Sequence, residues 1–489
     1  MLHHEAIKVF ILLSSCVCCY KFIIFVCIKF NKELPMITKL EITGFKSFRD
    51  FTIEFSPFTV IAGKNASGKS NLFDALELLS RCADYDLRTA FPERRGTIAE
   101  QFTLLDNDTH CDRMSFAVEL LLERTVKDNW GRVAELNCPR LRYELEISLG
   151  KDPQGFETLI LEREQLSKIP MDSDHWAKYY IGSKPDKKQI WKVLKSGGTK
   201  TPFIQTDIDQ GVKIITVRQD GTQGNKRTFF ANKVSRTVLS SIETVDFPHI
   251  FAVREELRNW RFMQLNPDAL RQPTKQDAKL SYDISHEGEN LAAALYRIKA
   301  KDDYSIIAIS RLLNKFLPEY TSVDVVNDTV NKQFIIELTS KDNKVFSSRV
   351  LSEGTLRLLA LCIMQYDDTY RGLLCFEEPE NGIHPQRIQT MIQLLEDMTI
   401  DIMDDQPILR QVIVNTHSPN FISYLTKDLN NKNVSVWLSK MIPCIIGEAG
   451  SKQVIRCSRI TPVANTPSRS LFGVQDVKVT TLDLADYLS

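Results

Sequence analysis

The chain lacks several features that would place it in a simple class of protein. Its 62 basic residues are balanced by 62 acidic ones, so it has no overall positive charge for holding nucleic acid. Its eleven cysteines include no pair of C-x-x-C motifs at metal-ligand spacing. No heptad pattern extends over several repeats, which excludes long coiled-coil arms. The 489 residues can nevertheless bury a large core.

The cysteines that are present indicate a compartment. They are scattered, and Cys362 and Cys375 lie in apolar segments where a reduced thiol behaves as a small hydrophobic group. This usage suits a reducing environment, so we expect a cytoplasmic protein.

Residues 1–35 differ from the rest of the chain. Residues 9–30 are almost all apolar and long enough to span a bilayer, but Lys21 in their middle costs about 3 kcal/mol on insertion. No small-residue cleavage site follows, which disfavours a signal peptide. We interpret 1–35 as an upstream extension, with Met36 as the natural start. A membrane anchor is the alternative, and we expect no membrane partner.

A phosphate-binding loop is the first motif. Phe58 to Ala62 reads as a short buried strand, and apolar residues at helical spacing begin at Leu72. The segment between them fits G-x-x-x-x-G-K-[ST], with the expected nucleotide-binding residues Gly63, Lys64, Asn65, Ala66, Ser67, Gly68, Lys69, Ser70 and Asn71. We expect Lys69 to neutralise the β- and γ-phosphates of ATP and Ser70 to ligate Mg²⁺.

A second anion site is predicted far along the chain. Ser352 is a good N-cap for a helix whose apolar face begins at Leu356, and Glu353 and Gly354 occupy its first turn. A helix N-terminus with serine and glycine binds anions. Lys69 already accounts for the phosphate of its own chain, so Ser352, Glu353 and Gly354 are expected to contact nucleotide held by another copy.

Two further apolar strands end in polar residues. Leu373 to Phe376 is followed by Glu377, which we expect to face the metal, and by Glu378, the expected general base. Gln411 to Val414 is followed by Asn415-Thr416-His417-Ser418, and we expect His417 to act at the γ-phosphate.

These motifs resemble the ABC-type ATPases and, within them, the RecF/SMC-like branch that includes the OLD family. The resemblance lies in the G-F-K-S-F turn after residue 43, the E-P-E-x-x-x-H-P box from Glu378 and the N-T-H-S-P segment from Asn415. It implies an α/β fold: an ATPase head with a central mixed sheet, an antiparallel side sheet and a helical lobe. It also implies ATP and Mg²⁺ as ligands, and a homodimer with composite ATP sites.

The chain departs from that family pattern in two places. Glu377 stands where aspartate is usual, and the signature reads S-E-G-T. The family also has a glutamine-bearing loop, for which Gln165 and Gln264 are both candidates, and neither is assigned.

The motifs define expected domain boundaries. We expect an extension at 1–35, a head at 36–440 with an inserted helical and basic lobe at about 170–345, and a tail at 441–489. Strands are predicted at 114–122, 141–149 and 157–162, and a short return strand at 345–350. Basic runs from Lys184 to Lys200 and from Lys226 to Arg236 could contact DNA, but we favour the interpretation that they are solvated loops or lobe edges.

Only 72 residues follow His417, too few for the Toprim nuclease domain that OLD nucleases carry there, and they contain no Asp-x-Asp pair. We therefore expect an ATPase that controls a separate effector, a nuclease or a toxin, as in two-gene antiphage systems. The alternatives are a RecF-like DNA-repair ATPase and a membrane-tethered regulator. A transporter subunit fits the spacing less well.

Overall fold

The computed structural model describes residues 35–91, 96–106, 109–151, 154–181, 201–219, 226–231, 235–277, 283–369, 372–399, 410–426, 431–446, 453–464 and 487. In this part of the chain no helix is long and apolar enough to cross a bilayer. The apolar segment 9–30 and the basic run 184–200 lie outside the described residues.

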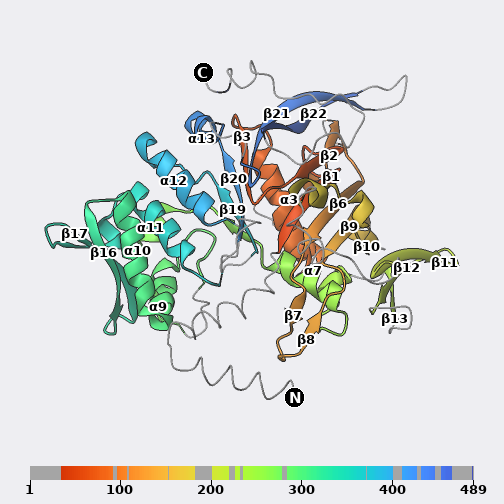
Figure 1. Ribbon diagram of the computed structural model, residues 1–489. Coiled ribbons are helices and arrows are strands. Elements are labelled where there is room, and N and C mark those ends of the chain that lie inside the picture. Colours follow the sequence, from red (N-terminus) through yellow and green to blue (C-terminus); the bar gives the residue numbers. More distant parts are fainter. Residues whose placement is uncertain are drawn as a thin grey trace, which may run out of the picture.

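A six-stranded sheet forms the centre of the molecule (Figure 1). Its strands, in spatial order, are β14 (Arg261–Met263), β19 (Gly372–Glu377), β20 (Arg410–Thr416), β3 (Phe58–Gly63), β21 (Val434–Ile446) and β22 (Gln453–Ala464). All neighbours are parallel except β21 and β22, which form an antiparallel hairpin. The central sheet is therefore mixed, as predicted.

Alternation of side chains divides this sheet between two cores. On β19, Leu373 and Cys375 belong to one apolar cluster, whereas Leu374 and Phe376 belong to the other. Successive side chains of a strand point to opposite faces, so a strand buried on both faces must be apolar throughout. This explains why the predicted central strands read as continuous apolar runs.

The first core lies between the central sheet and an eight-stranded antiparallel side sheet. The strands of the side sheet, in spatial order, are β13 (Lys226–Phe230), β12 (Val212–Arg218), β11 (Ile204–Asp209), β10 (Glu157–Lys168), β9 (Arg140–Lys151), β6 (Arg113–Leu121), β1 (Met36–Thr43) and β2 (Phe51–Glu54). Helices α3 (Lys69–Cys82) and α7 (Pro248–Arg258) contribute apolar side chains to this core. The short helix α4 (Leu87–Ala90) packs on α3.

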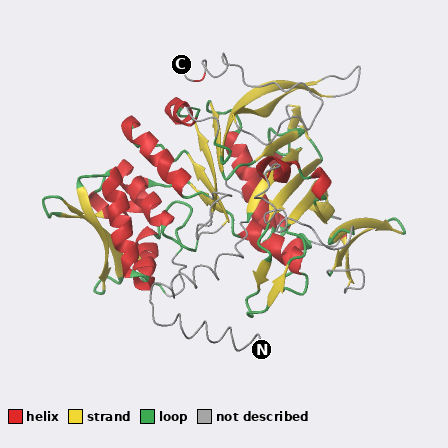
Figure 2. Cartoon of the chain, in the orientation of Figure 1, coloured by secondary structure: helices red, strands yellow, loops and turns green. Residues whose placement is uncertain are grey.

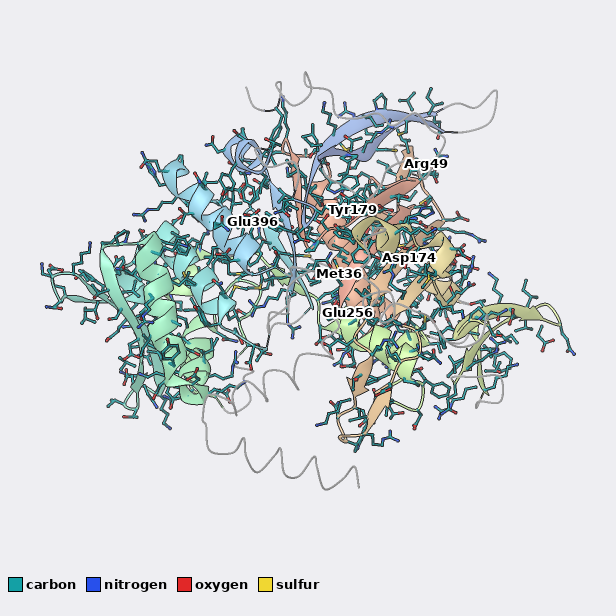
Figure 3. All side chains as sticks on the ribbon, in the orientation of Figure 1. Met36, Arg49, Asp174, Tyr179, Glu256 and Glu396 are labelled. Carbon is teal, nitrogen blue, oxygen red and sulfur yellow. The ribbon has the colours of Figure 1, made fainter. Side chains whose placement is uncertain are left out.

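A buried ion pair holds the start of β1. Arg140 donates to both carboxylate oxygens of Asp174 at 2.7 and 3.0 Å and to Thr38 on β1 at 2.9 Å. Asp174 in turn accepts from the backbone of helix α5 (His175–Ile181), and Trp176 of that helix packs against Met36. Met36 and Asp174 are labelled near the centre of Figure 3.

The second core supports the helical lobe, which lies at the left of Figure 2. Its helices are α8 (Pro267–Arg271), α9 (Leu291–Lys301), α10 (Asp303–Phe316), α11 (Glu353–Gln365), α12 (Pro385–Asp397) and α13 (Pro419–Leu425). A small sheet of β15 (Thr274–Lys275), β17 (Gln333–Ser340), β16 (Tyr320–Asp328) and β18 (Val345–Ser347) completes the lobe. Two minor pairs, β4 (Leu104–Asp106) with β5 (Thr109–His110) and β7 (Thr125–Lys127) with β8 (Val133–Glu135), lie elsewhere.

The structure divides the chain differently from the expected boundaries. The segment 170–345, expected as one inserted lobe, gives three strands to the side sheet and β14 to the central sheet before it enters the helical lobe. The boundary at residue 440 falls inside β21. The return strand predicted at 345–350 ends at Ser347 and becomes a 3₁₀ turn. The first two differences come from pairing between distant segments, which local patterning does not specify.

Candidate functional site

The candidate site lies where the parallel strands of the central sheet end. Register places Phe376 beside Met263, Glu377 beside Asn415 and Thr416 beside Ala62. The phosphate loop, the acidic box and the histidine segment therefore leave the sheet at one edge. The carboxyl edge of a parallel sheet is the usual ligand-binding edge of such folds.

The phosphate loop has the backbone that its glycines predict. Gly68 is left-handed with φ 92°, and a Cβ there would lie 1.7 Å from Ser458 Oγ. The Lys69 ammonium donates to the carbonyl oxygens of Gly63 and Lys64 at 2.8 and 3.0 Å. Burial lowers the pKa of Lys69, while the charges of Glu378, Glu380 and Glu377 oppose that shift. Lys69 and the acidic box thus share one electrostatic environment.

Serines from the β21–β22 hairpin support this loop. Ser439 and Ser458 both donate to the Ser67 carbonyl, at 2.8 and 3.2 Å. Ser458 also lies 2.6 Å from Ser47, whose hydroxyl accepts from the Asn71 amide at 2.7 Å. Asn71, which was expected to bind nucleotide, is thus tied to Ser47. Sequence reasoning missed Ser439 and Ser458, because nothing in their local pattern signals a phosphate loop.

Glu378 is held in a strained backbone conformation with φ 44°. Its N–H donates to Asn415 Oδ1 at 3.0 Å, and its carboxylate receives a bond from Asn381 at 2.9 Å. The second carboxylate oxygen lies 2.9 Å from His417 Nδ1. Burial raises the pKa of Glu378. The hydrogen bonds that Glu378 makes with Asn381 and His417, together with the nearby positive charge of Lys69, lower it by more, so the net shift is downward. The carboxylate is therefore ionised, as a general base must be.

Glu380 lies deeper in the same edge. It is 6% exposed, Thr416 donates to its Oε1 at 2.5 Å, and its Oε2 has no hydrogen-bond partner among the described residues. Burial raises its pKa, so Glu380 binds a proton more readily than an exposed carboxyl.

The donor chemistry at this edge suits Mg²⁺. Ser70 lies in the first turn of α3 and Glu377 is the last residue of β19, so a hydroxyl and a carboxylate are available near the phosphate loop. Hard divalent cations prefer oxygen ligands of this kind.

The signature residues lie in a separate cavity of about 300 Å³. Ser352 caps α11, accepting from the Thr355 N–H at 3.3 Å. The cavity is lined by Ser352, Glu353, Gly354, Leu358, Gly382, Ile383, His384 and Arg387, and none of them belongs to the phosphate loop. A Cβ on Gly354 would lie 2.9 Å from the Gly382 carbonyl, so the start of α11 packs tightly on the loop that follows the acidic box.

The two candidate glutamines occupy different sheets. Gln165 lies on β10, where its amide oxygen accepts from Arg163 at 2.8 Å. Gln264 follows β14 directly, one step beyond the Met263–Phe376 pair, at the same sheet edge as Glu377. The second basic run noted in the sequence, from Lys226 to Arg236, begins on the edge strand β13, which contains Lys226 and Arg227.

Known proteins resemble this chain in sequence and in structure. A family model described as "AAA domain, putative AbiEii toxin, Type IV TA system" matches residues 58–423. The DNA replication and repair protein RecF of Ligilactobacillus salivarius is 30% identical over 106 residues, 22% of this chain and 27% of that protein. RecF of a Nostoc species is 29% identical over 126 residues, 25% of this chain and 31% of that protein. The chain thus matches less than a third of the length of either relative.

Among solved structures, an Smc head bound to the C-winged helix domain of ScpA covers 86% of this chain and 98% of its own, at 15% identity and a TM-score of 0.42. The SMC head domain of Thermotoga maritima covers 88% and 99%, at 12% identity and a TM-score of 0.35.

Proposed function

The chain belongs to this family of AAA domains, as an ATPase of the ABC-type, RecF/SMC-like kind, and on that premise we propose that two copies clamp and hydrolyse ATP between them. One observation carries the proposal. The sequence predicts two anion-binding elements, the Lys69 loop and the Ser352 helix start, and the cavity at the second is lined by no residue of the first. A second copy that placed its Ser352 on the nucleotide held by Lys69 would complete the site.

In the proposed mechanism, Lys69 and the loop amides bind the phosphates and Glu378 accepts the proton of the attacking water. His417 holds Glu378 in place and faces the γ-phosphate. Gln264 follows β14 at the same sheet edge as Glu377. Ser70 and Glu377 would hold Mg²⁺, which supplies charge neutralisation of the phosphates.

The substitution Glu378→Gln tests the dimer. The amide keeps the shape of the side chain but cannot accept the proton, so ATP should stay bound and hydrolysis should stop. Light scattering should then detect a mass gain from monomer to dimer with ATP and Mg²⁺, and none with ADP. Turnover near wild type, or a mass independent of ATP, would contradict the proposal.

We further propose that this cycle controls a separate effector protein in antiphage defence. The support is the family description, which names a toxin and a type IV toxin–antitoxin system. The test is whether the chain co-purifies with the product of the neighbouring gene, and whether that association is gained or lost when ATP is added.

A RecF-like role in DNA repair is the second candidate, supported by the two RecF relatives. ATPase activity stimulated by DNA, without any toxic partner, would favour it.

A further inference from the structure

Two helices of the lobe begin at the same cavity. Helix α11 begins at Glu353 and α12 at Pro385, and the two helices contact one another (Figure 1). Residues at the start of both helices line the cavity of about 300 Å³ that contains Ser352. The backbone N–H groups of a first helical turn carry partial positive charge, so both helix starts favour an anion in the cavity that they share.

The acidic residue of this cavity is offset from within the chain. A Cβ placed on Gly382 would lie 3.1 Å from Glu353 Oε2 and 2.9 Å from Arg357 Nη1, so the carboxylate and the guanidinium meet on one side of Gly382. Burial lowers the pKa of Arg357, and the charges of Glu353 and Glu380 oppose that shift. Arg357 does not line the cavity, whereas Arg387 does. The charge of Glu353 therefore has its own counter-charge and does not require Arg387.

Arg387 is a loosely held cation in this cavity. It lies in the first turn of α12, where the helix dipole disfavours positive charge. Its ion-pair partner is Glu319, at 3.3 Å, and the two side chains are 39% and 48% exposed. Exposed pairs of this kind contribute little to stability. The guanidinium can therefore leave Glu319 at small cost and turn to an anion that enters the cavity from outside.

We propose that Arg387 belongs to the composite ATP site and acts in trans, donating to the γ-phosphate of nucleotide held by Lys69 of the other copy. The inference rests on the proposed function, because it places Arg387 on the same face as Ser352. A guanidinium presents planar donors that match phosphate oxygens. An arginine supplied by a second protein stabilises the charge that develops during phosphoryl transfer.

Substitutions of Arg387 test its part in hydrolysis. Arg387→Gln removes the charge, and kcat should fall about 10²-fold. Calorimetry should find the Kd for ATP within about twofold of wild type, because the loop of Lys69 holds the nucleotide. Arg387→Lys keeps a positive charge and should recover part of the loss. Glu319→Gln removes only the ion-pair partner and should hydrolyse ATP as wild type does. An equal loss of kcat in Glu319→Gln and Arg387→Gln would overturn the proposal.

Mixing variants shows whether Arg387 acts on the nucleotide of its own chain or of the other copy. When Arg387→Gln is mixed with Lys69→Ala, one composite site carries both lesions and the other neither, so turnover should partly return. When Arg387→Gln is mixed with Ser352→Arg, each site carries one lesion, and turnover should stay lost. The reverse pattern would place Arg387 at its own chain's nucleotide and would overturn the proposal.

The mixture of Ser352→Arg with Lys69→Ala separates this inference from the proposed function. If that mixture recovers turnover and Arg387→Gln with Lys69→Ala does not, the composite site stands and Arg387 is not part of it. If the mixture of Ser352→Arg with Lys69→Ala stays inactive, the composite site itself fails, and the role of Arg387 fails with it.

Discussion

Glu378 Oε1 lies 2.9 Å from His417 Nδ1, and the two residues leave the ends of the neighbouring parallel strands β19 and β20. The pair joins two motifs that lie far apart in sequence. Asn415, on the same strand as the histidine segment, accepts the Glu378 N–H and holds its left-handed backbone. Glu378, the expected general base, is thus positioned by β20, the strand that leads to His417.

Replacing His417 should change the pH dependence of hydrolysis. The His417 contact lowers the pKa of Glu378 whereas burial raises it, so His417→Ala should raise that pKa. A base works only when ionised, and the acidic limb of the kcat profile should therefore move to higher pH, with kcat down by about 10²-fold. The pH profile of steady-state turnover is the measurement. A lower kcat with an unmoved acidic limb would mean that His417 does not act through Glu378.

Lys69→Ala should abolish ATP binding, because the ammonium is the main counter-charge for the phosphates. Isothermal titration calorimetry measures the affinity directly. Lys315→Ala, at an exposed position of α10, is the matched control and should bind as wild type does. If Lys69→Ala binds ATP with the affinity of wild type, residues 63–70 are not the phosphate-binding loop.

Ser352→Arg should block the ATP-bound dimer and spare ATP binding by the monomer. Its cavity contains no residue of the phosphate loop, so a large cation there should clash with the other copy and leave the chain's own nucleotide in place. Mixing it with Lys69→Ala gives one composite site with both lesions and one with neither, and turnover should partly return. If Ser352→Arg alone leaves dimerisation and turnover intact, the composite site is wrong and Ser352 only caps helix α11.

Burial raises the pKa of Glu164 to about 7 in the folded state. An unfolded glutamate titrates near 4.5, so between these values the folded chain binds more protons and its stability falls as pH rises. The loss for this residue is on the order of 3 kcal/mol above pH 7. Glu54 and Glu256, whose pKa values burial also raises to about 7, add to the same trend.

Urea unfolding at pH 5.5 and pH 7.5 measures this effect. Glu164→Gln removes the titrating group, so its free energy of unfolding should fall less across that interval than that of wild type. The buried side chain accepts from the N–H groups of Val238 and Leu239, which an amide oxygen can still partly satisfy. Glu157→Gln, at an exposed position, should keep the wild-type difference. Equal pH dependence in wild type and Glu164→Gln would contradict the assignment.

The sequence alone determined the elements whose information is local. Gly63 to Ser70 needs glycines for its left-handed turn and a strand and helix on either side, and all of these are readable within a few residues. The apolar run of β19 followed by Glu377 and Glu378 is equally local. The fold class was implied by the family resemblance that these motifs carry.

Only the tertiary structure decided which distant residues meet those motifs. Gln165 and Gln264 have similar local surroundings in sequence, and strand order alone puts Gln264 beside β19 and Gln165 in the side sheet. Ser458 reaches the phosphate loop because β22 pairs with β21. The physical reason is that periodicity specifies which face of an element is apolar, whereas long-range pairing specifies what covers that face.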